Sequence, residues 1–160
     1  MTNFFVPKNI LYIKDYEFED GTKKPKLLII LGIIDNELFV LQAITTSQDK
    51  TVPDNLIKHG CTNLDLERLS FYIFEKNKPI GLKPNNESFG FEKNTFIFFQ
   101  TNISKEPLLN FLKYKGNIQH LATLSDEEYQ HLVNCISQSN LVKRKLKPYF
   151  EELLKNLFHL

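Results

Sequence analysis

Residues Lys26-Leu-Leu-Ile-Ile-Leu-Gly32 form a continuous apolar run, which predicts a β-strand that is buried on both faces. The turn residues Asp35-Asn36 follow it, and a second strand-like run, Leu38-Phe-Val-Leu-Gln-Ala-Ile44, comes next. Because only a short turn separates the two runs, we expect 26–31 and 38–44 to be neighbouring antiparallel strands.

Three further runs have the composition of strands, and they cover 9–15, 70–74 and 95–99. Tight turns such as Asp20-Gly21 separate several of the five runs. Five short strands within about a hundred residues predict a small, strongly curved barrel. The stretch 76–88, which is rich in Pro and Asn, predicts a loop or a small hairpin.

Helices are expected mainly in the last third of the chain. Residues 105–113 predict one short helix, and 63–69 predict an earlier helical turn. Ser125 with Glu128 three residues later has the pattern of a capping box, so a helix should begin there. Pro148 suits the first turn of a last helix, whose apolar side chains recur on one face and are typical of a helix docked on a core.

Composition indicates one globular unit of the α+β class, mainly β. The chain has 160 residues, of which 42% are apolar and 24% are charged. We expect a barrel domain with its helix over 1–142, and an additional amphipathic helix over 143–160 packed on the same domain. Twenty basic residues stand against nineteen acidic ones, so nucleic-acid binding would have to be local.

The two cysteines, Cys61 and Cys135, form no CxxC motif and no Cys/His cluster, so we expect no metal and no cofactor. Two unpaired thiols are typical of a reducing compartment. The N-terminus has no signal-peptide pattern, and the apolar run 27–34 is too short to span a bilayer. These observations predict a cytoplasmic protein without membrane association.

Two segments could form a site for a phosphate. Residues 20–26 precede one buried strand and 43–47 follow the next, so antiparallel pairing would bring them together. Lysine ammonium groups beside threonine hydroxyls can bind a phosphate and stabilise charge on its oxygens. The structural alternative is that the lysines are solvated in a turn and the threonines cap the backbone.

The order of several motifs resembles the PemK/MazF-type toxins of type II toxin–antitoxin systems. That family has a strand and a polar loop ending in Arg-Pro before an aliphatic run, which Gly21-Thr-Lys-Lys-Pro25 and 27–30 match. It continues with a strand ending in Ile-Thr, as in Gln42-Ala-Ile-Thr-Thr-Ser47. A Gly-Phe segment with charged residues matches 89–97, and an acidic helix start matches 121–128. The resemblance covers about residues 9–142.

The resemblance implies an SH3-like barrel with a C-terminal helix, usually a homodimer, and an antitoxin protein as a partner. It also implies an endoribonuclease (an mRNA interferase) that cuts single-stranded RNA without a metal. The family's two residues tied to cleavage match Lys24 and Thr45, and their neighbours Lys23, Lys26, Thr46 and Ser47 would bind the substrate. Attack by the ribose 2′-OH on the adjacent phosphate requires no protein nucleophile.

The chain departs from the family pattern at several positions. Lys24 stands where the family has Arg, and Lys8-Asn9 stands in place of an opening Gly-Asp. Residues 49–88 are longer than usual. These departures favour a second hypothesis, a catalytically inactive SH3-like module that binds protein or nucleic acid, whereas the retained Thr45-Thr46-Ser47 favours the enzyme. An unrelated small β-domain is a third hypothesis.

Overall fold

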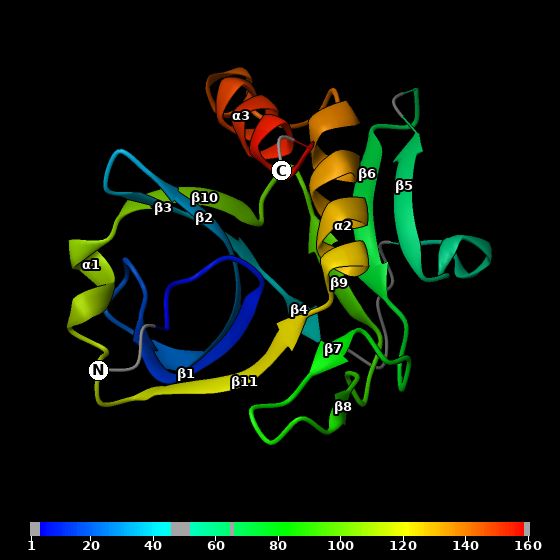
Figure 1. The fold of residues 1–160 in the computed structure, drawn as a ribbon. Helices are drawn as coiled ribbons and strands as arrows, with labels where there is room; N and C mark the ends of the chain where they lie inside the picture. Colours follow the sequence, from blue (N-terminus) through cyan, green and yellow to red (C-terminus); the bar gives the residue numbers. More distant parts are fainter. Residues whose placement is uncertain (1–3, 46–51, 65, 159–160) are drawn as a thin grey trace.

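The computed structural model describes residues 4–45, 52–64 and 66–158, and within these the chain forms two antiparallel sheets and three α-helices (Figure 1). The expected α+β, mainly β, class is confirmed. Neither sheet closes on itself, because each has two edge strands: β10 and β8 in one, β4 and β5 in the other. The strong curvature that the sequence predicted is present in the larger sheet, but a closed barrel is not.

The larger sheet is built around the first three strands of the chain. In spatial order its strands are β10 (Ile103–Pro107), β3 (Glu37–Gln42), β2 (Lys23–Ile34), β1 (Asn9–Glu17), β11 (Ile118–Leu124), β7 (Gly81–Leu82) and β8 (Ser88–Phe89). The predicted antiparallel pairing of 26–31 with 38–44 is confirmed, with Leu28 opposite Gln42. Asp35 and Asn36 both have positive φ, which the two-residue turn of a hairpin requires.

The smaller sheet contains four strands. Their spatial order is β4 (Ile44–Thr45), β9 (Thr95–Phe98), β6 (Leu69–Phe74) and β5 (Gly60–Leu64). The chain passes from one sheet to the other at Ala43, whose N–H bonds to the carbonyl of Leu27 while the next residue, Ile44, pairs with Phe96. The predicted strands 70–74 and 95–99 thus belong to this second sheet, and the predicted hairpin within 76–88 is formed by β7 and β8.

Some sequence predictions of secondary structure were wrong. Residues 103–107 form strand β10 instead of the start of a helix, because Lys105 pairs with Phe39 at the sheet edge; only α1 (Leu109–Leu112) is helical there. The helical turn expected over 63–69 is replaced by β5 and a turn into β6. Strand β11 was not predicted. Tertiary pairing therefore overrides the weak local preference of these segments.

Strand β2 is buried on both faces, as its continuous apolar run predicted. Ile29 and Leu31 belong to the main core, which lies between the two sheets and beneath the two long helices. Leu28 and Ile30 belong to a second core on the other face, covered by the N-terminal segment and Phe111 of α1. A third, smaller core lies on the far face of the smaller sheet.

Two long helices follow β11. Helix α2 (Asp126–Gln138) begins with the predicted cap, in which the Ser125 hydroxyl accepts a hydrogen bond from the Glu128 N–H at 3.1 Å. Helix α3 (Lys147–Phe158) begins one residue before Pro148 and packs through Tyr149 and Phe150 against Phe39. Among the described residues, no helix combines the length and apolar character needed to cross a bilayer.

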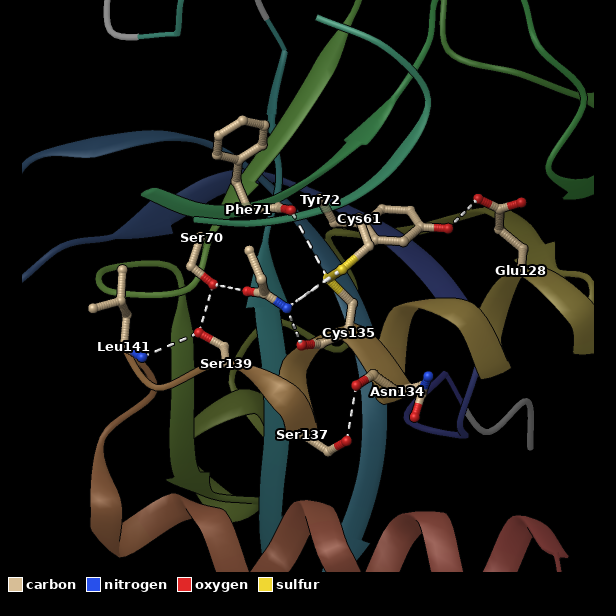
Figure 2. The surroundings of a disulfide bond; sticks show 11 residues. Cys61, Ser70, Phe71, Tyr72, Glu128, Asn134, Cys135, Ser137, Ser139 and Leu141 are labelled. Atoms are coloured by element: carbon tan, nitrogen blue, oxygen red, sulfur yellow. Dashed lines mark hydrogen bonds between the residues drawn. A yellow bond between two sulfur atoms is a disulfide. The ribbon is translucent and has the colours of Figure 1, made fainter. Parts of the chain in front are cut away.

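Cys61 of β5 and Cys135 of α2 form a disulfide (Figure 2). The expectation of two unpaired thiols was therefore wrong. The cysteines lie 74 residues apart in sequence, and the packing of α2 beside β5 brings their Cα atoms to 5.7 Å. Sequence spacing contains no signal for such a pairing, because it depends on how two distant elements meet.

Candidate functional site

A groove of about 510 Å³ opens at one end of the larger sheet, and we call it the Lys26 groove. Three parts of the chain line it. They are Tyr16–Asp20 at the end of β1, then Lys26, Leu28 and Gln42 on the neighbouring strands, and finally Thr101, Asn102, Ser104 and Glu106 in and before β10. The lining brings a cation, a carboxylate, amides, hydroxyls and aromatic rings together in one place.

Lys26 is the cation of the groove. Its Nζ lies 3.9 Å from the centre of the Tyr16 ring and 5.5 Å from the centre of the Phe18 ring, so the ammonium is held over aromatic faces. Burial lowers the pKa of Lys26, while the Glu106 carboxylate acts in the opposite direction. Lys26 is therefore a partly desolvated cation with a fixed position.

A bulge in β1 places the Tyr16 ring over this lysine. Ile13 pairs with Lys26, but Tyr16 pairs with Lys24, so β1 contains one more residue than β2 between these two pairs. Because side chains alternate between faces along a strand, the extra residue turns Tyr16 to the face on which Lys24 and Lys26 lie. A regular register would have turned the ring to the opposite face.

Tyr16 forms an aromatic platform. Its ring stacks on Tyr114 at 5.2 Å and meets the edge of Phe18 at 5.1 Å, and the Tyr114 hydroxyl accepts a hydrogen bond from the Glu17 N–H. Burial, with a smaller contribution from Glu106, raises the pKa of Tyr16 to about 12, so the phenol stays neutral near pH 7. Because Tyr114 stacks on the Tyr16 ring and the Lys26 ammonium lies over it, the ring serves to position the lysine.

Asn102 and Glu106 provide the other polar groups. Asn102 is 7% exposed, and its Oδ1 accepts a hydrogen bond from the Phe98 N–H at 2.8 Å. Asn102 lines the groove, and its side-chain Nδ2 is a hydrogen-bond donor. The Glu106 Oε2 accepts from the Ser104 hydroxyl at 3.4 Å, and its charge acts on both Lys26 and Tyr16. A bound phosphate would thus meet two donors and one proton acceptor.

The site residues predicted from the sequence lie on different surfaces of the protein. Lys26 lines the groove, whereas Lys23 and Lys24 are exposed on β2 opposite Glu17 and Tyr16. Thr45 lies on β4 of the other sheet, with its hydroxyl 3.4 Å from the Thr95 hydroxyl. Within the described residues, the groove lining contains neither Lys24 nor Thr45. Thr46 and Ser47 lie outside the described residues.

Lys24 and Thr45 nevertheless lie at the same end of the larger sheet, as predicted. The hydrogen bond from Ala43 N–H to Leu27 O fixes this relationship, because Thr45 is two residues beyond Ala43 and Lys24 is three residues before Leu27. Thr45 departs from the sheet at that point because its own strand pairs with β9. The two ends are neighbours, but they contribute to different surfaces.

Sequence reasoning missed three groove residues: Tyr16, Asn102 and Glu106. Tyr16 and Phe18, two residues apart just before the Asp20-Gly21 turn, are the only local signal that could have indicated an aromatic platform. Glu106 was assigned to a helix, and it reaches the groove because residues 103–107 form a strand that pairs with β3 in the curved sheet.

Charge at the groove is negative overall. Four carboxylates line it, from Glu17, Glu19, Asp20 and Glu106, with Lys26 as the single cation of the lining. The Glu17 carboxylate lies 3.8 Å from the Lys113 ammonium. A polyanion would therefore be held by point contacts to individual donors and lysines, not by a broad positive field.

A second polar cluster joins β5, β6 and α2. The Glu128 carboxylate accepts hydrogen bonds from His59 Nε2 at 2.6 Å and from the Tyr72 hydroxyl at 2.8 Å. His59 Nδ1 accepts from the Glu75 N–H, so its ring proton lies on Nε2. Burial alone would raise the pKa of Glu128, but the two hydrogen bonds leave it lowered. Every polar atom of the His59 ring is thus engaged, and the cluster is structural.

The chain matches no protein-family model, no curated protein and no solved structure at a significant level. The chemistry of the groove is therefore the main indication of function. Among the described residues, no group of three His, Cys, Asp or Glu side chains is arranged to hold a metal ion.

Proposed function

We propose that the chain is a toxin-type endoribonuclease that binds single-stranded RNA in the Lys26 groove and cleaves it by attack of the 2′-OH on the adjacent phosphate. One observation carries the proposal: a half-buried lysine is fixed by an aromatic ring and faces a carboxylate in an open polar groove. The aromatic ring would hold the lysine in position, and the lysine would contact a phosphate of the RNA.

The reaction needs only groups that the groove contains. Glu106 would accept the proton of the 2′-OH as that oxygen attacks phosphorus. Lys26 and the Asn102 amide would stabilise the negative charge that develops on the phosphate oxygens. The bond to the 5′-oxygen then breaks, and Lys26, whose pKa burial lowers, can supply the proton that this oxygen takes. The products are a 2′,3′-cyclic phosphate and a 5′-hydroxyl.

Lys24 and Thr45 match the residues that the family ties to cleavage, and here we assign them contacts to the substrate beside the groove. Lys24 lies on the same face of β2 as Lys26, two residues away, and would bind a neighbouring phosphate. The proposal also includes an SH3-like relationship for the curved sheet, a homodimer in solution, an antitoxin protein as a partner and a cytoplasmic location. The sequence resemblance supports the first three statements, while the cytoplasmic location rests on the sequence observations above, of which the expectation of unpaired thiols was wrong.

The test is digestion of a long single-stranded RNA by the purified chain in the presence of EDTA. Wild type should cleave and leave cyclic phosphate ends, while Lys26→Ala should be slower by about a hundredfold or more, the typical cost of losing an oxyanion donor. Lys83→Ala is the matched control, because Lys83 is an exposed lysine on the β7–β8 hairpin. Cutting of a substrate with a 2′-deoxy sugar at the cleavage site would contradict the mechanism.

The carboxylates that line the Lys26 groove favour one alternative function. Four carboxylates around a single groove cation suit a binding module that accepts a protein segment carrying basic residues. In that case wild type would not cleave RNA under any of these conditions, and Lys24→Arg would not create activity. Cleavage by Lys24→Arg alone would instead identify a toxin fold that has lost catalysis.

A further inference from the structure

The disulfide between Cys61 and Cys135 lies in the wall of a second cavity, of about 310 Å³, between β5 and α2. His59, His131, Asn134 and Gln138 line the same cavity. Amide and imidazole groups therefore line a cavity whose wall contains the sulfur–sulfur bond. This cavity is separate from the Lys26 groove and shares no residue with it.

The two sulfur-bearing residues differ strongly in accessibility. Cys61 is exposed on the edge strand β5, whereas Cys135 is 1% exposed and its Sγ lies 3.9 Å from the Phe71 carbonyl oxygen. An external thiolate can therefore approach Cys61 from solvent but not Cys135. Accessibility and thiolate character decide which cysteine reacts.

Contacts other than the disulfide also attach α2 to the sheets. Glu128 is held by His59 and Tyr72, and the Tyr129 hydroxyl donates to the Leu31 carbonyl. Near the sulfurs, Asn63 Nδ2 donates to the Cys135 carbonyl at 3.2 Å. These contacts, together with the main core, would keep the helix in place after the sulfur–sulfur bond is broken.

We propose that Cys61 is a thiol-exchange site, at which low-molecular-weight thiols reversibly modify the protein. A thiolate attacks Cys61 Sγ, the Cys61–Cys135 bond breaks, and a mixed disulfide forms on Cys61. The electron pair leaves on Cys135 Sγ, which takes a proton from water. A second thiolate attacks the sulfur of the attached thiol, which releases Cys61 as a thiolate and forms the disulfide of the small thiol.

The surroundings favour this outcome. Asn63 Nδ2 lies 3.5 Å from Cys61 Sγ and 3.8 Å from Cys135 Sγ, so its N–H can donate to the sulfur that gains charge. Cys135 is buried in the last turn of α2, where the helix dipole disfavours a thiolate, so its release is slow but the released sulfur remains protonated. Once protonated, Cys135 can donate to the Phe71 carbonyl and is retained as a neutral thiol, which slows its return to the bond with Cys61.

The experiment uses glutathione as the probe thiol. The folded protein is incubated in glutathione redox buffers, quenched with acid, and analysed by intact and peptide mass spectrometry. We expect one glutathione adduct, on the Cys61 peptide, at intermediate ratios, and a free dithiol at the most reducing ratio. Urea unfolding of the reduced protein should remain one cooperative transition. An adduct on Cys135, or reduction that occurs only in denaturant, would overturn the proposal.

Single-cysteine variants separate reactivity from folding. Cys135→Ser leaves only the Cys61 thiol, which should react with an aromatic disulfide reagent at the rate of an exposed thiol. Cys61→Ser leaves only the buried Cys135 thiol, which should react about a hundredfold more slowly until urea is added, because it needs a local opening. Equal reaction rates in the two folded variants would contradict the proposed difference in accessibility between Cys61 and Cys135. None of these readouts depends on RNA cleavage.

Discussion

Lys26 Nζ on β2 lies 3.9 Å from the centre of the Tyr16 ring on β1, although Tyr16 pairs in the sheet with Lys24. One extra residue in β1 produces this relationship, because it turns an aromatic side chain to the face of the lysine. The bulge therefore places the Tyr16 ring against Lys26, and this contact holds the lysine ammonium in one position. The first three predictions below depend on this pair.

Lys26 and Lys24 should contribute unequally to cleavage. Lys26→Ala should slow cleavage by about a hundredfold or more, because it removes the donor within the groove. Lys24→Ala should have a smaller effect, and Lys24→Arg should retain or raise the rate, because guanidinium binds phosphate through two donors. Single-turnover rates on one RNA would measure both. If Lys24→Ala lowers the cleavage rate more than Lys26→Ala does, then Lys24 makes the main contact to the reacting phosphate.

Cleavage should decline at alkaline pH as Lys26 loses its proton. Because burial lowers the pKa of Lys26 below the ordinary 10.5, the midpoint of this decline should also lie below 10.5. A pH–rate profile corrected for spontaneous RNA hydrolysis is the measurement. Lys26→Arg should move the decline to higher pH, since guanidinium remains protonated. If the cleavage rate declines at the same alkaline pH in wild type and in Lys26→Arg, a group other than Lys26 causes the decline.

Tyr16 should contribute to binding through its ring and not through its hydroxyl. Tyr16→Ala should weaken binding of a non-cleavable single strand by about 0.5–2 kcal/mol, because Lys26 loses the ring that positions it. Tyr16→Phe keeps the ring and should bind within a few-fold of wild type. Fluorescence anisotropy with a 2′-deoxy oligonucleotide gives both affinities. A loss as large in Tyr16→Phe as in Tyr16→Ala would point to the hydroxyl instead.

Glu128 should stabilise the fold at neutral pH and lose that effect in acid. Its pKa in the folded protein is lowered from 4.5, so ionised Glu128 is favoured by folding, and its contribution declines as pH falls from about 4.5 through the lower folded value. Glu128→Gln should cost roughly 1–3 kcal/mol in the free energy of unfolding at pH 7, the value of hydrogen bonds to a charged group.

Glu127→Gln is the matched control for this measurement, because Glu127 is exposed on the same helical turn. Urea unfolding at pH 7 and near pH 3.5 should show that the difference between wild type and Glu128→Gln shrinks in acid. If both variants behave like wild type at pH 7, the hydrogen bonds from His59 and Tyr72 contribute little to stability.

The proposed homodimer requires an exposed apolar surface, and the phenylalanines of the strands do not provide it. Most Phe-rich strand positions, such as Phe39 and Phe71, are buried in the cores, whereas Leu109 and Leu112 of α1 are 76% and 46% exposed. Light scattering should give twice the 18.8 kDa of the chain, and Leu109→Asp should lower that mass towards one chain. A single 18.8 kDa species for wild type at micromolar concentration would exclude a stable dimer.

The sequence predicted well those elements whose signal is local. The apolar run of β2, the turn at Asp35-Asn36 and the cap at Ser125 each depend on neighbouring residues, and all three are confirmed. Strands β10 and β11 were not predicted, because edge pairing with β3 and β1 determines their conformation more than their composition does.

The candidate site was predictable only in part, for the same reason. The sequence indicated lysines at the right end of β2, but the bulge that selects Lys26 depends on how β1 pairs with its neighbour. Glu106 lies eighty residues after Lys26 in the sequence. The disulfide likewise depends on the packing of α2 beside β5.

The spatial order of the larger sheet also determines how the chain can fold as it is synthesised. Strands β1, β2 and β3 can pair as soon as they are made, but the other edge of β1 pairs only with β11, whose residues 118–124 come after the whole of the smaller sheet. Until then β1 presents an unpaired edge that another chain could join. Completion of the sheet requires contacts between residues as far apart as Asn9 and Thr123, so folding should be slow, and nascent chains should be most prone to aggregate before Leu124 is available.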